Sequence, residues 1–247
     1  MLHRFANPTR FLKMSNAVLP WATGLTVIFI GSGLYFAFGA SPADYQQGET
    51  VRIMYVHVPS AWMAMFAYAF IAVASAVGLI WKHPVAHVCA LASAPIGACF
   101  TLICLTTGSL WGKPMWGTWW VWDARLTSVL VLFFLYLGFI ALANAFDDAT
   151  RGEKASAILA LVGAVNLPII KFSVDWWNTL HQPASVTKIG MPAVHFSMLT
   201  PLLLMAVGFT MLFVVLVIVR ARAVLEERRI NALRSARIHA DTAQNVA

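Results

Sequence analysis

Long apolar runs separated by short polar connections set the pattern of this chain. Each run is close to the roughly 20 residues that an α-helix needs to cross a bilayer. The runs are apolar on all sides and show no strict alternation, which favours buried or lipid-facing helices over strands. We therefore predict an all-α integral membrane protein with six transmembrane helices, over residues 21–38, 61–81, 86–107, 126–146, 155–172 and 198–219.

The composition agrees with this pattern. Hydrophobic residues make up 60% of the chain, charged residues 11%, and the mean hydropathy is +0.74, values well beyond those of an ordinary soluble domain. The predicted spans and their connections use up the 247 residues, so we predict one polytopic domain over 1–247. The first apolar run is long enough to span, so no cleavable signal peptide is predicted. No CxxC pattern is present, and all three cysteines fall in one apolar run: Cys89, Cys99 and Cys104.

The distribution of charge predicts which way the chain crosses the membrane. Six spans place both termini on one side, and that side holds twelve of the 17 lysines and arginines, six of them in a tail over 220–247. Short cytoplasmic loops carry the excess of basic residues, so we predict cytoplasmic termini and a cytoplasmic helix in the tail. The net charge of +7 then indicates orientation against membrane lipid, and we predict no nucleic-acid partner.

The segment WGKPMWGTWWVWD, from Trp111 to Asp123, is the most unusual stretch of the chain. It lies in the predicted outer loop 108–125. Tryptophan combines a flat apolar face with one N–H donor, so these side chains could form either a platform for a flat hydrophobic ligand or an interfacial belt without a ligand. The tryptophans are Trp111, Trp116, Trp119, Trp120 and Trp122.

Two observations favour the platform. Gly112, Pro114 and Gly117 are typical of turns and indicate a shaped loop. Eight of the ten tryptophans fall on the predicted outer side, whereas an anchoring belt should be more even.

A short helix in this loop would give four side chains one shared face at spacings of three and four residues: Trp116, Trp119, Trp120 and Asp123. Asp123 would be costly in lipid unless paired, and Arg125 could pair with it. Alternatively, basic residues on the outer side could bind the carboxylates of a haem, because cations make strong bonds to carboxylates. The residues leave both arrangements open; the cations are Arg52, Lys113 and Arg125.

Three histidines fall on the outer side, and two of them flank the tryptophan segment. His57 precedes the second span and His181 follows the fifth, so each could lean over the loop from an opposite flank. Imidazole is a common iron ligand, and a six-coordinate haem needs two of them facing each other. We interpret His57 and His181 as candidate axial ligands, against the alternative of plain interfacial polar residues. His195, next to the sixth span, is interpreted as structural.

With HVPSAW around His57 and NTLHQ around His181, the tryptophan motif resembles the haem exporter protein C family of bacterial cytochrome c maturation. The resemblance covers residues 43 to 182. It implies that the tryptophan-rich loop, called the WWD domain, holds haem b as cargo at the outer face of the bacterial inner membrane, and that His57 and His181 ligate the iron.

The same resemblance implies partners and excludes an enzyme. A periplasmic haem chaperone, protein E of the system, would receive the haem, and the small membrane protein D and the ABC transporter subunits A and B would complete the assembly. The chain carries no GxxxxGK[ST] nucleotide loop. A quinol-oxidising membrane cytochrome is a weaker alternative, because it needs histidine pairs inside the spans and only His87 lies within an apolar run. A scaffold that binds only proteins is the third.

Overall fold

The chain is mainly helical in the part that the structure, a computed structural model, describes: residues 6–182, 186 and 194–246. The elements are α1 (Pro8–Tyr35), the π-helix η2 (Phe36–Ala40), the 3-10 helix η3 (Glu49–Ile53), α2 (Met54–Trp81), α3 (Pro84–Trp116), α4 (Ala124–Asn144), α5 (Ala149–Gly163), α6 (Asn166–Trp176) and α7 (Phe196–Val246).

Six stretches within the described residues are long and apolar enough to cross a membrane. This confirms the predicted all-α membrane protein with six spans. The observed helices extend beyond the apolar runs, since α2 begins at Met54 and α3 continues to Trp116. In the described residues the only β contact is an isolated bridge between Asp44 and Gly48 in the first loop.

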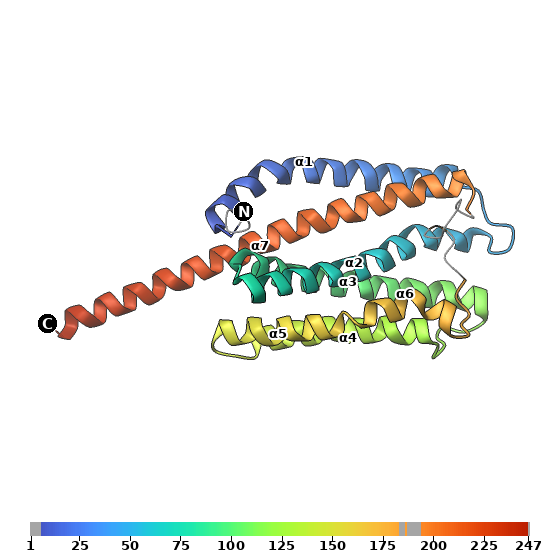
Figure 1. Ribbon diagram of the computed structural model, residues 1–247. Helices are drawn as coiled ribbons and strands as arrows, with labels where there is room; N and C mark the ends of the chain where they lie inside the picture. The colour runs from blue at the N-terminus through green and yellow to red at the C-terminus, as the bar shows by residue number, and fades with distance from the viewer. Residues whose placement is uncertain (1–5, 183–185, 187–193, 247) are drawn as a thin grey trace.

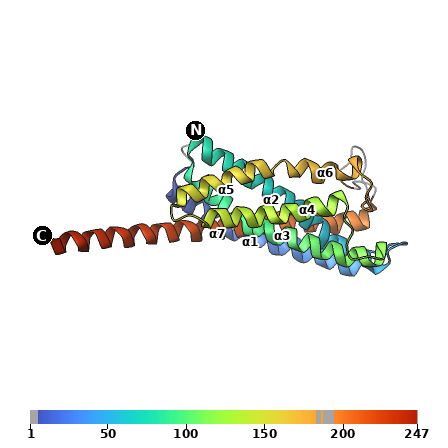
Figure 2. The same cartoon turned by 90° about the horizontal axis from the view of Figure 1, so that it is seen from below.

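The helices form three layers in Figure 1, with α1 and α7 in one, α2 and α3 in the middle, and α4 beside α5 and α6 in the third. Successive spans run in opposite directions. One end of the bundle, which we call the tryptophan end, holds the end of α3 and the starts of α2, α4 and α7. The opposite end holds the start of α1 and the extension of α7; Figure 2 shows this extension leaving the bundle.

The fifth span is broken, contrary to the single run predicted over 155–172. Helix α5 ends at Gly163 and α6 begins at Asn166. Pro168 gives the physical reason, because its ring lacks an N–H and would clash with a carbonyl one turn earlier in a continuous helix. At the break, the Asn166 side chain donates a hydrogen bond to the Ser128 carbonyl of α4, 2.8 Å away, which fixes α6 against α4.

Helix α7 extends the sixth span into the predicted tail without a break. Its 51 residues correspond to about 75 Å of helix, far more than the roughly 30 Å of a bilayer core. Arg228 pairs with Glu153 near the start of α5, so the first part of the extension is held against the bundle.

Tight packing between α2, α3 and α4 sets the centre of the bundle. Tyr136 of α4 is fully buried and donates a hydrogen bond to the Ala64 carbonyl of α2 at 2.7 Å. A Cβ atom added at Gly97 of α3 would lie only 2.3 Å from the Tyr136 ring. Gly97 therefore lets α3 approach this ring.

We expect Gly97→Ala to destabilise the bundle by about 1–3 kcal/mol, the usual cost of overpacking a close-packed interior. Thermal unfolding in detergent would measure this as a lower midpoint. Gly24→Ala is the matched control, because a Cβ there meets no atom within 4 Å. Equal midpoints for the two variants would contradict the packing described.

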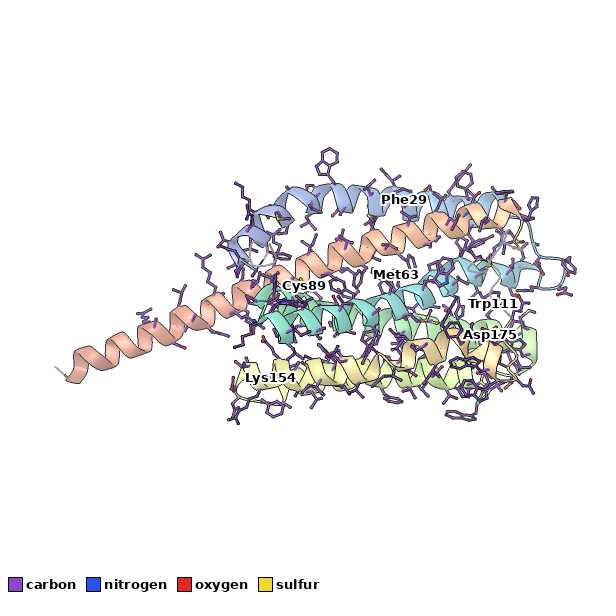
Figure 3. All side chains as sticks on the ribbon, viewed as in Figure 1. Phe29, Met63, Cys89, Trp111, Lys154 and Asp175 are labelled. Atoms are coloured by element: carbon purple, nitrogen blue, oxygen red, sulfur yellow. The ribbon has the colours of Figure 1, made fainter. Side chains whose placement is uncertain are left out.

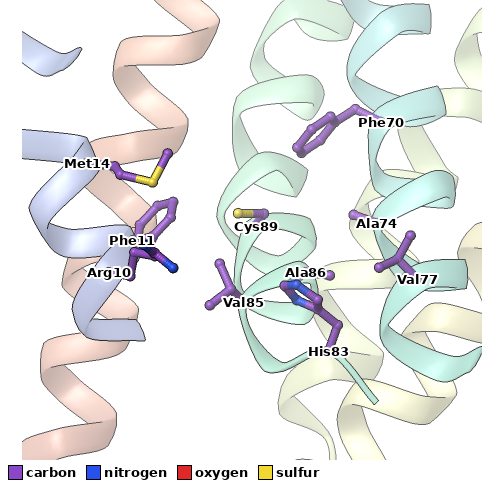
Figure 4. Close-up of a pocket in the computed structure, with 10 residues that line it drawn as sticks. All are labelled: Arg10, Phe11, Met14, Phe70, Ala74, Val77, His83, Val85, Ala86 and Cys89. Atoms are coloured by element: carbon purple, nitrogen blue, oxygen red, sulfur yellow. The ribbon is translucent and has the colours of Figure 1, made fainter. Parts of the chain in front are cut away.

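A cavity of about 270 Å³ opens between α1, α2 and α3 at the opposite end (Figure 4). Its walls are mainly apolar, with Arg10 and His83 as the polar exceptions. Because it lies at the far end of the spans from the tryptophan segment, it is not part of the candidate site.

Candidate functional site

The tryptophan segment begins as helix and only then becomes a loop. Helix α3 continues through Trp116 and ends at Gly117, whose φ of +75° is left-handed and whose N–H donates to the Lys113 carbonyl. Gly117 is therefore a turn, as predicted, whereas Gly112 and Pro114 lie inside the helix, which corrects their predicted role. The predicted loop over 108–125 shortens to the seven residues from 117 to 123.

The proposed face of four residues does not form. Trp116 ends α3, while Trp119 and Trp120 lie in the loop and Asp123 is the N-cap of α4. Asp123 is 9% exposed, and its Oδ1 accepts a hydrogen bond from the Leu126 N–H at 2.7 Å. A carboxylate at this position satisfies the unpaired N–H groups of the helix start, which local spacing alone had not revealed.

Arg125 does not pair with Asp123, contrary to one of the two arrangements considered. Its guanidinium donates to the Ser173 hydroxyl at 3.1 Å and to the carbonyls of Ile170 and Lys171 at 3.4 Å, all on α6. Arg125 thus ties α4 to α6. The Asp123 carboxylate faces His181 instead, with 3.7 Å between Oδ2 and Nδ1.

The other two cations differ in how far they are engaged. Arg52 pairs with Glu49 and donates to the Ala37 carbonyl of η2, so it closes the first loop. Lys113 is exposed; its ammonium donates to the Gly117 carbonyl at 3.0 Å and lies 6.0 Å from the centre of the Trp119 ring.

His57 lies within α2, near its start, rather than before the span as predicted. Its Nδ1 is 3.1 Å from the Thr107 hydroxyl of α3. The imidazole also packs edge-to-face on Trp111, with 5.7 Å between ring centres. The Trp111 N–H donates to the Gln47 side chain at 3.0 Å, so the first loop helps to hold this indole beside His57.

His181 lies in the segment after α6, mostly buried against the end of α3. Its ring centre is 4.9 Å from that of Trp116. Burial lowers the pKa of His181. The negative charge of Asp123 raises this pKa, and the positive charge of Arg125 lowers it further. The lower pKa keeps the imidazole neutral near neutral pH, and the neutral form is the one that binds a metal.

The two histidines thus meet at one place, each against a different tryptophan. The tryptophan end is also the end where Trp111 and Asp175 lie in Figure 3, far from Cys89 and Lys154. The structure therefore brings the two predicted ligands and the tryptophan segment together.

The remaining tryptophans divide into a contacting pair and an exposed surface. Trp120 packs edge-to-face on Trp122, with 5.5 Å between ring centres. Trp119 and Trp122 are 54% and 76% exposed. Three buried side-chain polar atoms lack a hydrogen-bond partner within the described part of the chain, and two are at this end, Trp120 Nε1 and His181 Nδ1.

Sequence reasoning missed three polar residues here: Gln47, Thr107 and Thr179. Thr179 donates to Asp123 and accepts from the His181 backbone N–H at 3.1 Å. His195 does lie at a helix start, where its Nδ1 accepts from the Ser197 N–H, in line with the structural role assigned to it.

The similarity to known proteins covers more of the chain than the motifs do. The family described as "Heme exporter protein C" matches residues 1–236, well beyond the 43–182 over which the motifs carried a resemblance.

Named relatives come from distant organisms. A "Heme exporter protein C" from Bradyrhizobium diazoefficiens is 57% identical over 92% of this chain and 86% of its own, and one from Escherichia coli K12 is 48% identical over 92% and 93%. A ccmC-like mitochondrial protein of Marchantia polymorpha, named for cytochrome c biosynthesis, is 47% identical over 78% and 81%.

Proposed function

The chain belongs to the Heme exporter protein C family, and on that premise we propose that it binds haem at the tryptophan end and delivers it for cytochrome c maturation. Haem b is the cargo, and its iron is ligated by His57 and His181. The protein acts in transfer and catalyses no reaction.

The observation that carries this proposal is the pairing of two imidazoles from distant parts of the chain. His57 comes from α2 and His181 from the segment after α6, yet each packs on a tryptophan near the end of α3. A porphyrin supplies four ligands to its iron and leaves two axial positions. Two neutral imidazoles at one site suit those positions.

The tryptophans and Lys113 suit the rest of the haem. Trp119 and Trp122 offer exposed flat apolar faces at the same end, and the buried Trp120 N–H is a donor without an acceptor. Lys113 is the cation best suited to a haem carboxylate, because Arg52 and Arg125 are engaged with backbone and side-chain groups of neighbouring elements.

Delivery then needs an aqueous face and an acceptor. We place the tryptophan end on the periplasmic side of the bacterial inner membrane and both termini in the cytoplasm, as the excess of basic residues at the opposite end favours. A periplasmic haem chaperone, protein E of the system, takes the haem there. Protein D and the ABC transporter subunits A and B are the expected partners within the membrane.

The test is haem binding and transfer by the purified protein. The wild type should show the visible spectrum of low-spin haem with two histidine ligands and should pass that haem to the chaperone. Trp119→Ala combined with Trp122→Ala should keep the protein in the membrane but weaken transfer by roughly thirtyfold or more, because truncating one tryptophan at a contact surface costs about 2 kcal/mol, which alone corresponds to roughly thirtyfold.

Trp21→Ala is the matched control, since that indole is 78% exposed on α1, outside the tryptophan segment. A wild-type protein without a haem spectrum would overturn the proposed function. Unchanged haem transfer by the Trp119 and Trp122 variant would show that the exposed tryptophans take no part in the proposed function.

A further inference from the structure

A different polar group lies beside Nδ1 in each of the two imidazoles. His57 Nδ1 faces a hydroxyl, that of Thr107, and His181 Nδ1 faces a carboxylate, that of Asp123. In a ligating histidine, the group opposite the free ring nitrogen fixes the tautomer, orients the ring and tunes its basicity.

Thr107 determines which nitrogen of His57 carries the proton. Its hydroxyl hydrogen points to the Ile103 carbonyl, 2.6 Å away on the same helix, so only the oxygen lone pairs remain for His57. This arrangement favours Nδ1 as the N–H that donates to Thr107 at 3.1 Å. In the neutral ring Nε2 then holds the lone pair that a metal needs.

Asp123 plays the corresponding role for His181. Its carboxylate is fixed on both oxygens, since Oδ1 accepts from the Leu126 N–H and Oδ2 from the Thr179 hydroxyl. Thr179 in turn accepts from the His181 backbone N–H, so a closed set of contacts joins the carboxylate to the histidine. The carboxylate oxygen lies 3.7 Å from Nδ1, beyond hydrogen-bond distance, so its negative charge rather than a hydrogen bond favours a proton on Nδ1 and leaves Nε2 as the metal-binding atom.

We propose that Thr107 and Asp123 are positioning residues that present Nε2 of both histidines to the iron, and that His181, backed by a charge, is the stronger ligand. A carboxylate draws the Nδ1 proton more strongly than a hydroxyl and gives the ring more imidazolate character. That character favours ferric over ferrous iron. The inference rests on the proposed function, because it assumes that the two histidines bind haem iron.

The test compares variants that remove the acceptor and keep the shape. Asp123→Asn retains the N-cap of α4, for which Asn is as suitable as Asp, but removes the charge. It should raise the reduction potential of the bound haem and weaken haem retention by about tenfold or more, the effect usual for such outer partners. Thr107→Val should shift both quantities in the same direction by a smaller amount, and Thr107→Ser should restore them.

Thr106→Val is the matched control. Thr106 is the neighbouring exposed residue of α3, and its hydroxyl donates only to carbonyls of its own helix. A purely structural role for Thr107 or Asp123 would lower thermal stability without moving the reduction potential. Reduction potentials equal to that of the wild type in both variants would overturn the positioning roles. A larger shift of the reduction potential in Thr107→Val than in Asp123→Asn would overturn the stronger ligation by His181.

Failure of this inference can be told from failure of the proposed function. If Thr107→Val and Asp123→Asn behave as the wild type while His57→Ala and His181→Ala lose haem, the histidines remain ligands and only the positioning roles fall. If the histidine variants keep their haem and its spectrum, both proposals fall.

Discussion

Removing both imidazoles should abolish stable haem binding. In His57→Ala combined with His181→Ala, the iron loses both axial ligands, whereas the tryptophan contacts alone hold only the porphyrin. Changes to the outer partners of a ligating histidine already cost about tenfold to a hundredfold in metal affinity, so loss of a ligand itself should exceed roughly a hundredfold. The absorbance of haem per protein, after purification in detergent, measures the effect.

Each single variant should lose the spectrum of two-histidine ligation, and added imidazole should restore part of it by occupying the vacated position. His195→Ala is the matched control, because the side chain of this exposed histidine bonds to Ser197 at the start of α7, outside the tryptophan segment. Normal haem content in both single variants and in the double variant, with protein still in the membrane, would reject the two ligands and the proposed function with them.

The number of spans was predictable from hydropathy, because lipid demands a run of apolar residues for each crossing. The bounds of the helices were less predictable. Helix α2 begins at Met54 and includes His57 and Ser60, which a hydropathy pattern assigns to a loop but which contact neighbouring groups in the fold. The break before Asn166 was missed because the residues around Pro168 stay apolar across it.

The residues of the candidate site could be proposed from the sequence, but the contacts between them could not. His57, His181 and the tryptophans are rare residue types at recognisable spacings. Their contacts depend on how distant helices pack, which no local spacing encodes. Thr107 is one of two adjacent threonines in an apolar run, and only the approach of α2 distinguishes it from Thr106. Gly108 was a weak signal of this close approach, since a Cβ there would lie 2.8 Å from the His57 ring.

The same packing gives two of the cations partners that local spacing did not suggest. Arg125 bonds to Ile170 of α6 and Arg52 to Ala37 of η2, partners that are 45 and 15 residues away in the chain. Sequence proximity had suggested Asp123 for Arg125, but Asp123 caps α4 and faces His181. An N-cap carboxylate that also faces a histidine links helix formation to the site, which explains why Asn is the informative substitution at this position.

The orientation of the chain should follow its basic residues, and delivery to a periplasmic acceptor depends on it. Among the residues that the structure describes, eleven lysines and arginines lie towards the opposite end and its tail, against four towards the tryptophan end. We expect a cysteine at Gln46 or Asn178, both exposed at the tryptophan end, to react with a thiol reagent that cannot cross the membrane. Cysteines at Thr150 or Ser235, exposed at the opposite end, should react only after the membrane is opened.

The three native cysteines lie on α3 and would first be replaced by alanine, with the haem spectrum checked to show that the site is intact. Gln46 is a suitable probe because its neighbour Gln47, and not Gln46 itself, holds Trp111. Labelling at Thr150 and Ser235 in intact cells, together with protection at Gln46 and Asn178, would put the histidines and tryptophans in the cytoplasm. Haem bound there could not pass directly to a periplasmic chaperone, so this outcome would overturn the proposed delivery while leaving haem binding itself in place.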